Sequence, residues 1–257
     1  MKKARAGATA KSKNPGGIHI AGARGCVTAT LMNPSNGNRI NVAMASELME
    51  LCERVEDDNS VAMLAITGAG RVFCTGFESD LNPNLVESLA VLSKPTVAII
   101  NGDATDEGME LALAADIRIA LNDARFALTQ PSRGEMPRFG GTQRLPRLAG
   151  IANAVRILVA GAEIDGLEAM RIGVVTYLAK DREELGARAA EVAQSILTRG
   201  PVAARMVKDA VRKGYDMTLD QGIRLEEDLY ALLQTTADRA EGVRAFLEKR
   251  KPLFRGA

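Results

Sequence analysis

The sequence predicts an α/β fold built from repeated strand–strand–helix units. Short apolar runs that contain β-branched residues, such as Thr96 to Ile100, fit buried strands. Segments with apolar residues at helical spacing, such as Val42 to Asp57, fit amphipathic helices. This rhythm of strands and helix first occurs before residue 76 and recurs between residues 93 and 150, which indicates a spiral of ββα units.

Composition and charge narrow the class of protein. The chain has 257 residues, enough for one large domain with a substantial core. Its hydrophobic content of 46% and charged content of 25% are ordinary for a soluble globular protein. A net charge of +1 argues against nucleic acid as an obligate partner. No apolar run approaches the ~20 residues that span a bilayer, so we expect no membrane segment.

The cysteines and the single histidine argue against a metal site. Cys26, Cys52 and Cys74 show no metal-ligand spacing, and their odd number argues against a disulfide framework. With His19 as the only histidine, a zinc site or a histidine-based triad is not expected. The pattern fits a protein of the reducing cytoplasm.

The chain divides into a tail, a core and a C-terminal helical region. Residues 1–17 carry several basic residues, no acid and few large apolar residues, which predicts a disordered basic tail. A targeting peptide is the alternative, although the stretch lacks the apolar core of a secretion signal. We expect a spiral core over residues 18–199 and a helical oligomerisation region over residues 200–257.

The first elements of the core follow from turn residues and periodicity. The cluster from Asn33 to Gly37 is a turn, and the cluster from Gly68 to Arg71 is another. The expected elements are a strand over Cys26 to Met32, a helix over Val42 to Asp57, a strand over Val61 to Thr67 and a short extension over Val72 to Thr75.

The central stretch contains a carboxylate among apolar neighbours. The strand over Thr96 to Ile100 ends in Asn101-Gly102, and Asp106 to Gly108 then opens a helix. Glu110 lies inside the first turn of that helix, and a second strand follows over Ile117 to Ala120. A carboxylate in such a place is paired, solvated by a cleft, or functional.

The part of the chain after Gly150 is expected to be largely helical. Pro201 fits the first turn of a helix because its missing N–H is not needed there. The expected helices cover Ile151 to Ala160, Gly166 to Ile172, Arg182 to Thr198, Pro201 to Val211 and Leu219 to Leu233.

Several segments together resemble a known family. They are Lys94 to Gly102 (KPTVAIING), Glu110 to Ala112 (ELA), Asp116-Ile117, Phe139 to Leu145 (FGGTQRL) and the end from Ala240 to Phe254. As a set they resemble the signature of the enoyl-CoA hydratase/isomerase (crotonase) superfamily, over nearly the whole chain. The resemblance implies a crotonase-like spiral with a C-terminal helical trimerisation region, assembled as a homotrimer or a dimer of trimers. It also implies an acyl-CoA thioester substrate, of which coenzyme A is a part, and no metal or redox cofactor.

By this resemblance, the chemistry is stabilisation of a thioester enolate by two backbone N–H groups, those of Phe77 and Glu107. Such preorganised donors supply several kcal/mol, and a helix N-terminus adds to them. The family usually has a glycine run where this chain has Asp106-Glu107-Gly108. Backbone donors need no particular side chain, but carboxylates oppose a nearby oxyanion unless they point to solvent. We therefore expect a loop that binds the thioester without activating it well.

The acid–base residues also differ from the pattern of the family. Its hydratases use two glutamates around one water, and Glu110 stands at the first position. Ser132 stands at the second, and a neutral hydroxyl without a partner is a poor general base. The segment from Pro131 to Gly134 is also shorter than usual. Glu135, which fits a surface charge at least as well, and Glu107 are the open alternatives for a second carboxylate.

The residues expected to bind coenzyme A are carried over from the same resemblance. They are Arg39, Ile40, Thr75, Gly76, Asp80 and Leu81, with Phe246 and Lys249 near the C-terminus. The basic run Lys249-Arg250-Lys251 fits either a solvated face or a partner for the phosphates. The connection from Gly76 to Pro95 is shorter than is common in the family, which leaves little chain to cover an acyl pocket.

The function expected from the sequence is hydratase or isomerase chemistry on an acyl-CoA, with Glu110 as the lone acid/base. The alternatives are an acyl-CoA-binding protein with little or no hydratase activity, and an acyl-CoA hydrolase. Loss of a positioned acid or base typically removes ~10²–10⁴ in rate, so we expect slow hydration of crotonyl-CoA.

Overall fold

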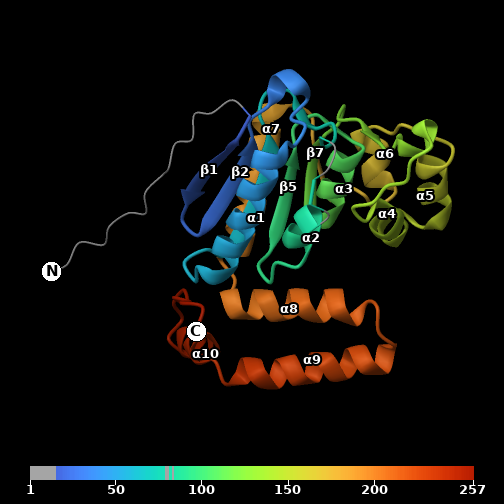
Figure 1. Cartoon of the computed structure of the whole chain (residues 1–257). Helices are drawn as coiled ribbons and strands as arrows, with labels where there is room; N and C mark the ends of the chain where they lie inside the picture. Colours follow the sequence, from blue (N-terminus) through green and yellow to red (C-terminus); the bar gives the residue numbers. More distant parts are fainter. Residues whose placement is uncertain (1–15, 79–80, 83) are drawn as a thin grey trace.

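The computed structural model describes residues 16–78, 81–82 and 84–257. Residues 1–15 of the predicted basic tail lie outside the described residues. The other boundaries of the tail, the core and the helical region remain predictions. In Figure 1, the strands form a layer with helices on its faces, and a helical region lies below that layer.

The main sheet has the order β1-β2-β3-β5-β7-β9. β1 is antiparallel to β2, and each later neighbour is parallel to the one before it. Central strands such as β3 are buried on both faces, which explains why they read as continuous apolar runs. The strands are β1 (Ile18–Ala23), β2 (Cys26–Leu31), β3 (Met63–Gly68), β5 (Thr96–Ile100), β7 (Ile117–Leu121) and β9 (Tyr177–Ala179).

A smaller parallel sheet contains β4 (Val72–Cys74), β6 (Asp103–Thr105) and β8 (Phe126–Ala127), in that order. Each of these strands follows a strand of the main sheet along the chain, and a helix comes after it. The successive units are β3-β4-α2, β5-β6-α3 and β7-β8-α4. The predicted spiral of ββα units is therefore confirmed.

The turn from β5 into β6 is held by one side chain. Asn101 accepts a hydrogen bond from the Gly68 amide at 3.1 Å and donates to the Gly68 carbonyl at 2.8 Å. It also donates to the carbonyl of Gly70 at 3.1 Å. The asparagine thereby joins the ends of β3 and β5, so that β4 and β6 leave the main sheet side by side.

Helices cover the main sheet. Figure 1 shows α1 and α2 in front of the strands and α7 behind them, where it contacts β3, β7 and β9. α1 begins where Asn41 accepts a hydrogen bond from the Met44 amide at 2.8 Å, an N-cap that satisfies a free donor. The helices of this region are α1 (Val42–Asp57), α2 (Asn84–Ala90), α3 (Glu107–Ala114), α4 (Gly141–Ala149), α5 (Ile151–Leu158), α6 (Gly166–Arg171) and α7 (Arg182–Leu197).

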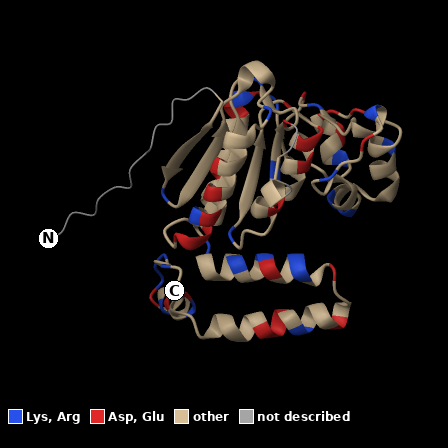
Figure 2. Cartoon of the chain, viewed as in Figure 1, with Lys and Arg blue, Asp and Glu red and all other residues tan. Residues whose placement is uncertain are grey.

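The C-terminal region contains α8 (Pro201–Gly214), α9 (Leu219–Gln234) and α10 (Ala237–Leu247), below the sheet in Figure 1. Figure 2 shows Lys and Arg recurring along α8. Two of these, Lys208 and Arg212, pair with Asp116 of the core at 2.7 and 2.9 Å. These ion pairs attach α8 to the start of β7.

Some elements differ from the sequence-based expectations. β1, α2 and α4 were not expected, and α2 lies within the connection from Gly76 to Pro95 that was expected to cover little. β6 and β8 span three and two residues, too few to show a periodicity. Among the residues that the structure describes, no helix combines the length and the apolar character needed to span a membrane.

Candidate active site

The candidate site lies at the carboxyl edge of the smaller sheet. β4 and β6 are parallel, with Cys74 opposite Ala104, so the segments that follow these strands emerge next to each other. The segment after β8 joins them there, because β8 pairs with β6. Side chains from these segments surround a cavity of about 640 Å³. It is lined by Arg39, Phe77, Glu78, Asp106, Glu107, Gln130, Arg133, Glu135, Met136 and Arg138.

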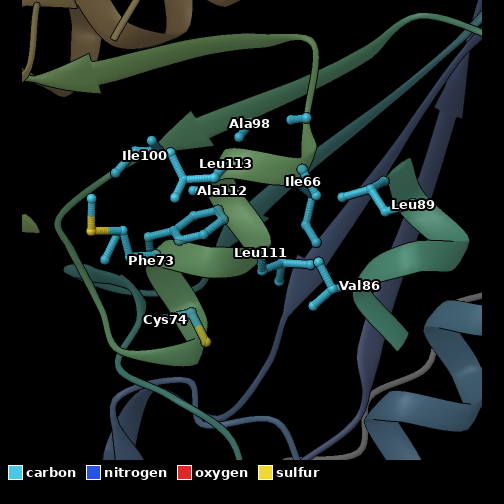
Figure 3. Close-up of a cluster of buried hydrophobic side chains, with 14 of the residues drawn as sticks. Ile66, Phe73, Cys74, Val86, Leu89, Ala98, Ile100, Leu111, Ala112 and Leu113 are labelled. Atoms are coloured by element: carbon cyan, nitrogen blue, oxygen red, sulfur yellow. The ribbon is translucent and has the colours of Figure 1, made fainter. Parts of the chain in front are cut away.

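The helix behind the cavity packs closely on β4. Figure 3 shows Phe73 and Cys74 of β4 beside Leu111 and Leu113 of α3. A side chain at Gly108 would collide with the carbonyl oxygen of Cys74, so only glycine permits this approach. The close packing places the N-terminus of α3 beside the segment that carries Phe77.

Phe77 stands on the cavity wall with a fixed ring and an occupied N–H group. Its ring packs edge-on against that of Phe139, with centroids 5.0 Å apart. The preceding Gly76 has φ of 137°, a conformation that favours glycine. The Phe77 amide donates a hydrogen bond to Oε2 of Glu107 at 3.1 Å. The predicted donor therefore lies at the cavity, and a carboxylate of the same chain already accepts from it.

Glu107 is the first residue of α3 and lines the cavity. No hydrogen bond joins its amide to another residue of the described chain, so this second predicted donor is available at a helix N-terminus. The Glu107 carboxylate is directed toward the predicted donor, since it contacts the Phe77 amide. The physical reason is that glutamate at this helix position is long enough to reach the exposed end of the β4 segment.

The carboxylate of Asp106, unlike that of Glu107, contacts the segment after β8. Its carboxylate accepts from the amide and hydroxyl of Thr129 at 2.6 and 2.8 Å, and it pairs with Arg133 at 3.3 Å. Its backbone has φ 51° and ψ −127°, a region that costs a non-glycine residue about 1–3 kcal/mol. The bonds to Thr129 and Arg133 hold the residue in this strained conformation.

Glu110 is fully buried behind the cavity wall. Its Oε1 accepts from the amides of Phe139 and Gly141, both at 2.8 Å, and so caps the start of α4. Gln130 donates to its Oε2 at 3.4 Å. Burial raises the pKa of Glu110 to about 6, against the lowering effect of the two amides. Glu110 does not itself line the cavity, whereas Gln130 does.

Ser132 and Glu135 lie on the segment after β8. The Ser132 side chain is exposed and donates to the carbonyl of Thr129 at 2.7 Å. The structure does not bring it to the cavity, because the short helical turn over Gln130–Arg133 directs it away. Glu135 lines the cavity and pairs with Arg133 at 3.3 Å.

Most residues expected to bind coenzyme A come together beside Phe77. The Ile40 amide donates to the carbonyl of Gly76 at 3.1 Å, and the Arg39 guanidinium donates to the carbonyl of Thr75 at 3.3 Å. The side chains of Ile40 and Leu81 are buried. Asp80 lies outside the described residues.

Phe246 and Lys249 are not brought to the cavity within one chain. Both are exposed, at the end of α10 and just after it. The neighbouring Arg250 is held by Glu241 at 2.6 Å and by Glu248 at 2.5 Å, so this member of the basic run is already paired. Contacts to Glu241 instead anchor the C-terminal segment against α10, including the Leu253 amide at 2.9 Å.

Reasoning from the sequence missed several residues of the site. Gln130 and Phe139 contact Glu110, and Arg133 and Arg138 line the cavity. Gln130 lies three residues after β8, a strand too short to predict. Phe139 acts through its backbone amide, for which the sequence carries no side-chain signal. No cluster of His, Cys, Asp or Glu suited to a metal ion occurs among the described residues.

Comparison with known proteins gives the family. The sequence model described as enoyl-CoA hydratase/isomerase matches residues 22–257. The protein named "Enoyl-CoA hydratase domain-containing protein 2, mitochondrial" from Mus musculus is 36% identical, over 90% of this chain and 84% of that protein. "(E)-Benzylidenesuccinyl-CoA hydratase" from Thauera aromatica is 35% identical, over 89% and 94%.

A solved structure gives the same answer for the fold. The crystal structure of an enoyl-CoA hydratase from Bacillus anthracis matches with a TM-score of 0.89 and 32% identity, over 93% of this chain and 99% of that one. The predicted crotonase-like fold is confirmed, while its trimeric assembly stays a prediction. This chain belongs to the enoyl-CoA hydratase/isomerase family.

Proposed function

We propose that this protein is an acyl-CoA enzyme that moves a proton on the acyl chain, with Glu110 as its single acid/base. The best candidate reaction is the shift of a double bond in an enoyl-CoA. The observation that carries this proposal is the environment of Glu110. It is a buried carboxylate with a pKa near 6, held beside the wall of the cavity by Gln130. A general base of that pKa suits proton transfer near neutral pH.

A single carboxylate is sufficient for such a shift. Glu110 removes a proton from the α-carbon of a 3-enoyl-CoA, and the electron pair delocalises into a dienolate whose negative charge rests on the thioester oxygen. The same carboxylic acid returns the proton at the γ-carbon, which gives the 2-enoyl-CoA. Atoms and charge balance without water or a cofactor. Hydration needs in addition a group that activates a water, and the exposed Ser132 offers no support for that role.

In this proposal, the amides of Phe77 and Glu107 hold the thioester oxygen. Coenzyme A lies along Arg39, Ile40 and the segment from Thr75 to Phe77, which the pairing of these segments supports. Glu110 has to turn toward the cavity, past Gln130, before it reaches an acyl chain. Phe246 and Lys249 then contribute to coenzyme A only in an assembly of several chains.

The alternative is an acyl-CoA-binding protein without turnover. It is favoured by the contact of Glu107 with the Phe77 amide, which occupies a donor that an enolate needs. An acyl-CoA hydrolase is the third candidate, because its substrate is also a thioester and its reaction needs only one acid.

The test is a turnover assay of the purified protein with trans-3-hexenoyl-CoA and, separately, with crotonyl-CoA. We expect isomerisation to exceed hydration, and Glu110→Gln to lower isomerisation by ~10²–10⁴. Glu135→Gln is the matched control, because it removes a cavity carboxylate that does not contact Glu110's partners. Fast hydration that survives Glu110→Gln would contradict the proposal and point to Glu107 or Glu135. Binding without any turnover would favour the alternative.

We further propose that the protein works in the cytoplasm as a homotrimer or a dimer of trimers. The free thiols of Cys26, Cys52 and Cys74 support a reducing compartment. Exposed apolar side chains on α8 and α9, among them Val207 and Val211, support an assembly.

A further inference from the structure

The carboxylate of Glu107 occupies a place that the proposed function needs for a ligand. It accepts the hydrogen bond of the Phe77 amide at 3.1 Å. We propose that this side chain is a resident competitor for the thioester-oxygen site and thereby determines which coenzyme A derivatives bind well. The inference rests on the proposed function, because it assumes that a thioester oxygen is bound by that amide.

The site is shaped to receive this carboxylate. A Cβ atom at Gly76 would lie 2.7 Å from Oε2 of Glu107 and 2.8 Å from Nη1 of Arg39. The carboxylate therefore packs against the bare backbone of Gly76, with the Arg39 guanidinium also against that residue. A glycine here leaves room for the side chain of Glu107, and the same room is what a thioester group would enter.

The other acids around the cavity have different partners. Asp106 is bonded to Thr129 and Arg133, and Glu135 pairs with Arg133. Glu78 also lines the cavity, and its side chain makes no hydrogen bond to another described residue. Among the residues that the structure describes, Glu107 is thus the acid whose carboxylate bonds an amide assigned to the ligand.

Two consequences follow for a bound ligand. A thioester oxygen can accept from the Phe77 amide only after Glu107 has left it. The affinity for a thioester is therefore lowered by the free energy of the hydrogen bond between the Phe77 amide and the charged Glu107. A coenzyme A thioether has no thioester carbonyl oxygen and leaves Glu107 in place, so its binding does not cost the hydrogen bond between Glu107 and the Phe77 amide. The protein in its natural form therefore discriminates little between a thioester and the thioether of the same chain length.

The experiment measures this discrimination by calorimetric titration. The probes are butyryl-CoA, a saturated thioester with no double bond to shift or hydrate, and S-butyl-CoA, the thioether of equal length. We expect Glu107→Ala to bind butyryl-CoA about tenfold more tightly than the natural protein does, with the affinity for S-butyl-CoA unchanged. Glu78→Ala is the matched control, since it removes the same charge from the same cavity, and its ratio of affinities should stay that of the natural protein.

A second variant separates the effect from folding. Glu107→Gln keeps the length of the side chain and a carbonyl acceptor but removes the charge, so we expect a gain smaller than that of Glu107→Ala. The inference is overturned if both Glu107 variants keep the natural ratio while coenzyme A derivatives still bind, or if they bind butyryl-CoA more weakly. Failure of every protein to bind either probe would instead overturn the proposed function, and this inference with it.

Discussion

Gln130 offers Glu110 a hydrogen-bond partner in both of its protonation states. Burial raises the pKa of Glu110 to about 6, and the Oε1 atom of Gln130 is a buried acceptor with no hydrogen-bond partner among the described residues. A protonated Glu110 can donate to that oxygen once the Gln130 amide rotates. The ionised form instead accepts a hydrogen bond from the Gln130 NH₂ group at 3.4 Å. The pair therefore responds to the proton that the proposed reaction transfers.

A first prediction concerns stability and pH. Because the folded protein holds the proton of Glu110 up to about pH 6 and a free carboxyl holds it only to about 4.5, the folded state binds more protons between these values. The free energy of unfolding should therefore fall as pH rises through this window. At pH 7, Glu110→Gln should be more stable than the natural protein by about 2 kcal/mol, with no difference below pH 4.5. Urea unfolding at several pH values is the measurement, and a gain that does not depend on pH would rule out the ionisation of Glu110 as its cause.

The second prediction concerns the strained backbone of Asp106. Asp106→Ala loses the bonds to Thr129 and Arg133 and keeps the strain at φ 51°, whereas Asp106→Gly loses the same bonds and relieves it. The glycine variant should be about 1–3 kcal/mol more stable than the alanine variant. Thermal or urea unfolding of the two variants measures the difference, and equal stability would show that the conformation is unstrained.

Which side chains face the site could be predicted only in part. The motif positions of Phe77, Glu107 and Glu110 are readable in the sequence, and the structure places the first two at the cavity and the third behind its wall. The directions of the Glu107 and Ser132 side chains depend on the backbone angles of a loop and of a short helical turn. Neither is set by the local pattern of residue types, so both needed the structure.

At the scale of the elements, Asp116 joins α8 to the core. It accepts from the amide of Thr96 at 2.7 Å and pairs with Lys208 and Arg212. Lys208 is largely buried, and this burial lowers its pKa. A buried cation of this kind depends on its counter-charge.

A third prediction follows for this junction. Asp116→Asn keeps a side chain that can bond Thr96 but leaves Lys208 and Arg212 without their carboxylate, so it should lower the free energy of unfolding by about 3–5 kcal/mol. Lys208→Met in the same chain should restore part of the loss. Lys213→Met is the control, because its pair with Asp209 is exposed and worth less than about 1 kcal/mol. If Asp116→Asn were as mild as this control, the junction would not depend on charge.

The elements differ in how well the sequence predicts them. The helix over Val42–Asp57 has four turns of apolar periodicity and an asparagine cap, and both of its predicted ends agree with the structure. β6 and β8 are defined by pairing with neighbouring strands that lie far away in the sequence, and a segment of two or three residues carries no period of its own. Their existence therefore follows from the spiral as a whole.

For the whole molecule, the helices below the sheet carry apolar side chains that a single chain leaves exposed. No residue of α8 or α9 is fully buried, and Val207 and Val211 are 60% and 66% exposed on one face of α8. Apolar faces of this kind usually mark contacts between chains. The fourth prediction is a trimer or hexamer by light scattering at micromolar concentration, with Val211→Glu shifting the protein to smaller species. A natural protein that is monomeric at that concentration would contradict it.

The smaller sheet also separates the loops around the cavity from the pairing of the main sheet. β4 and β8 end at the same edge of the smaller sheet and pass into loops, whereas β6 passes through Asp106 into α3, and the main sheet is held by its own pairing. A change in the length of one such loop is absorbed locally, at a cost that grows only slowly with the number of residues. The segment from Pro131 to Gly134, which the resemblance implies to be shorter than usual, can therefore vary in length without a shift in the register of any strand. A side chain on one of these loops can therefore be replaced, or the loop changed in length, without a change in the pairing of the main sheet.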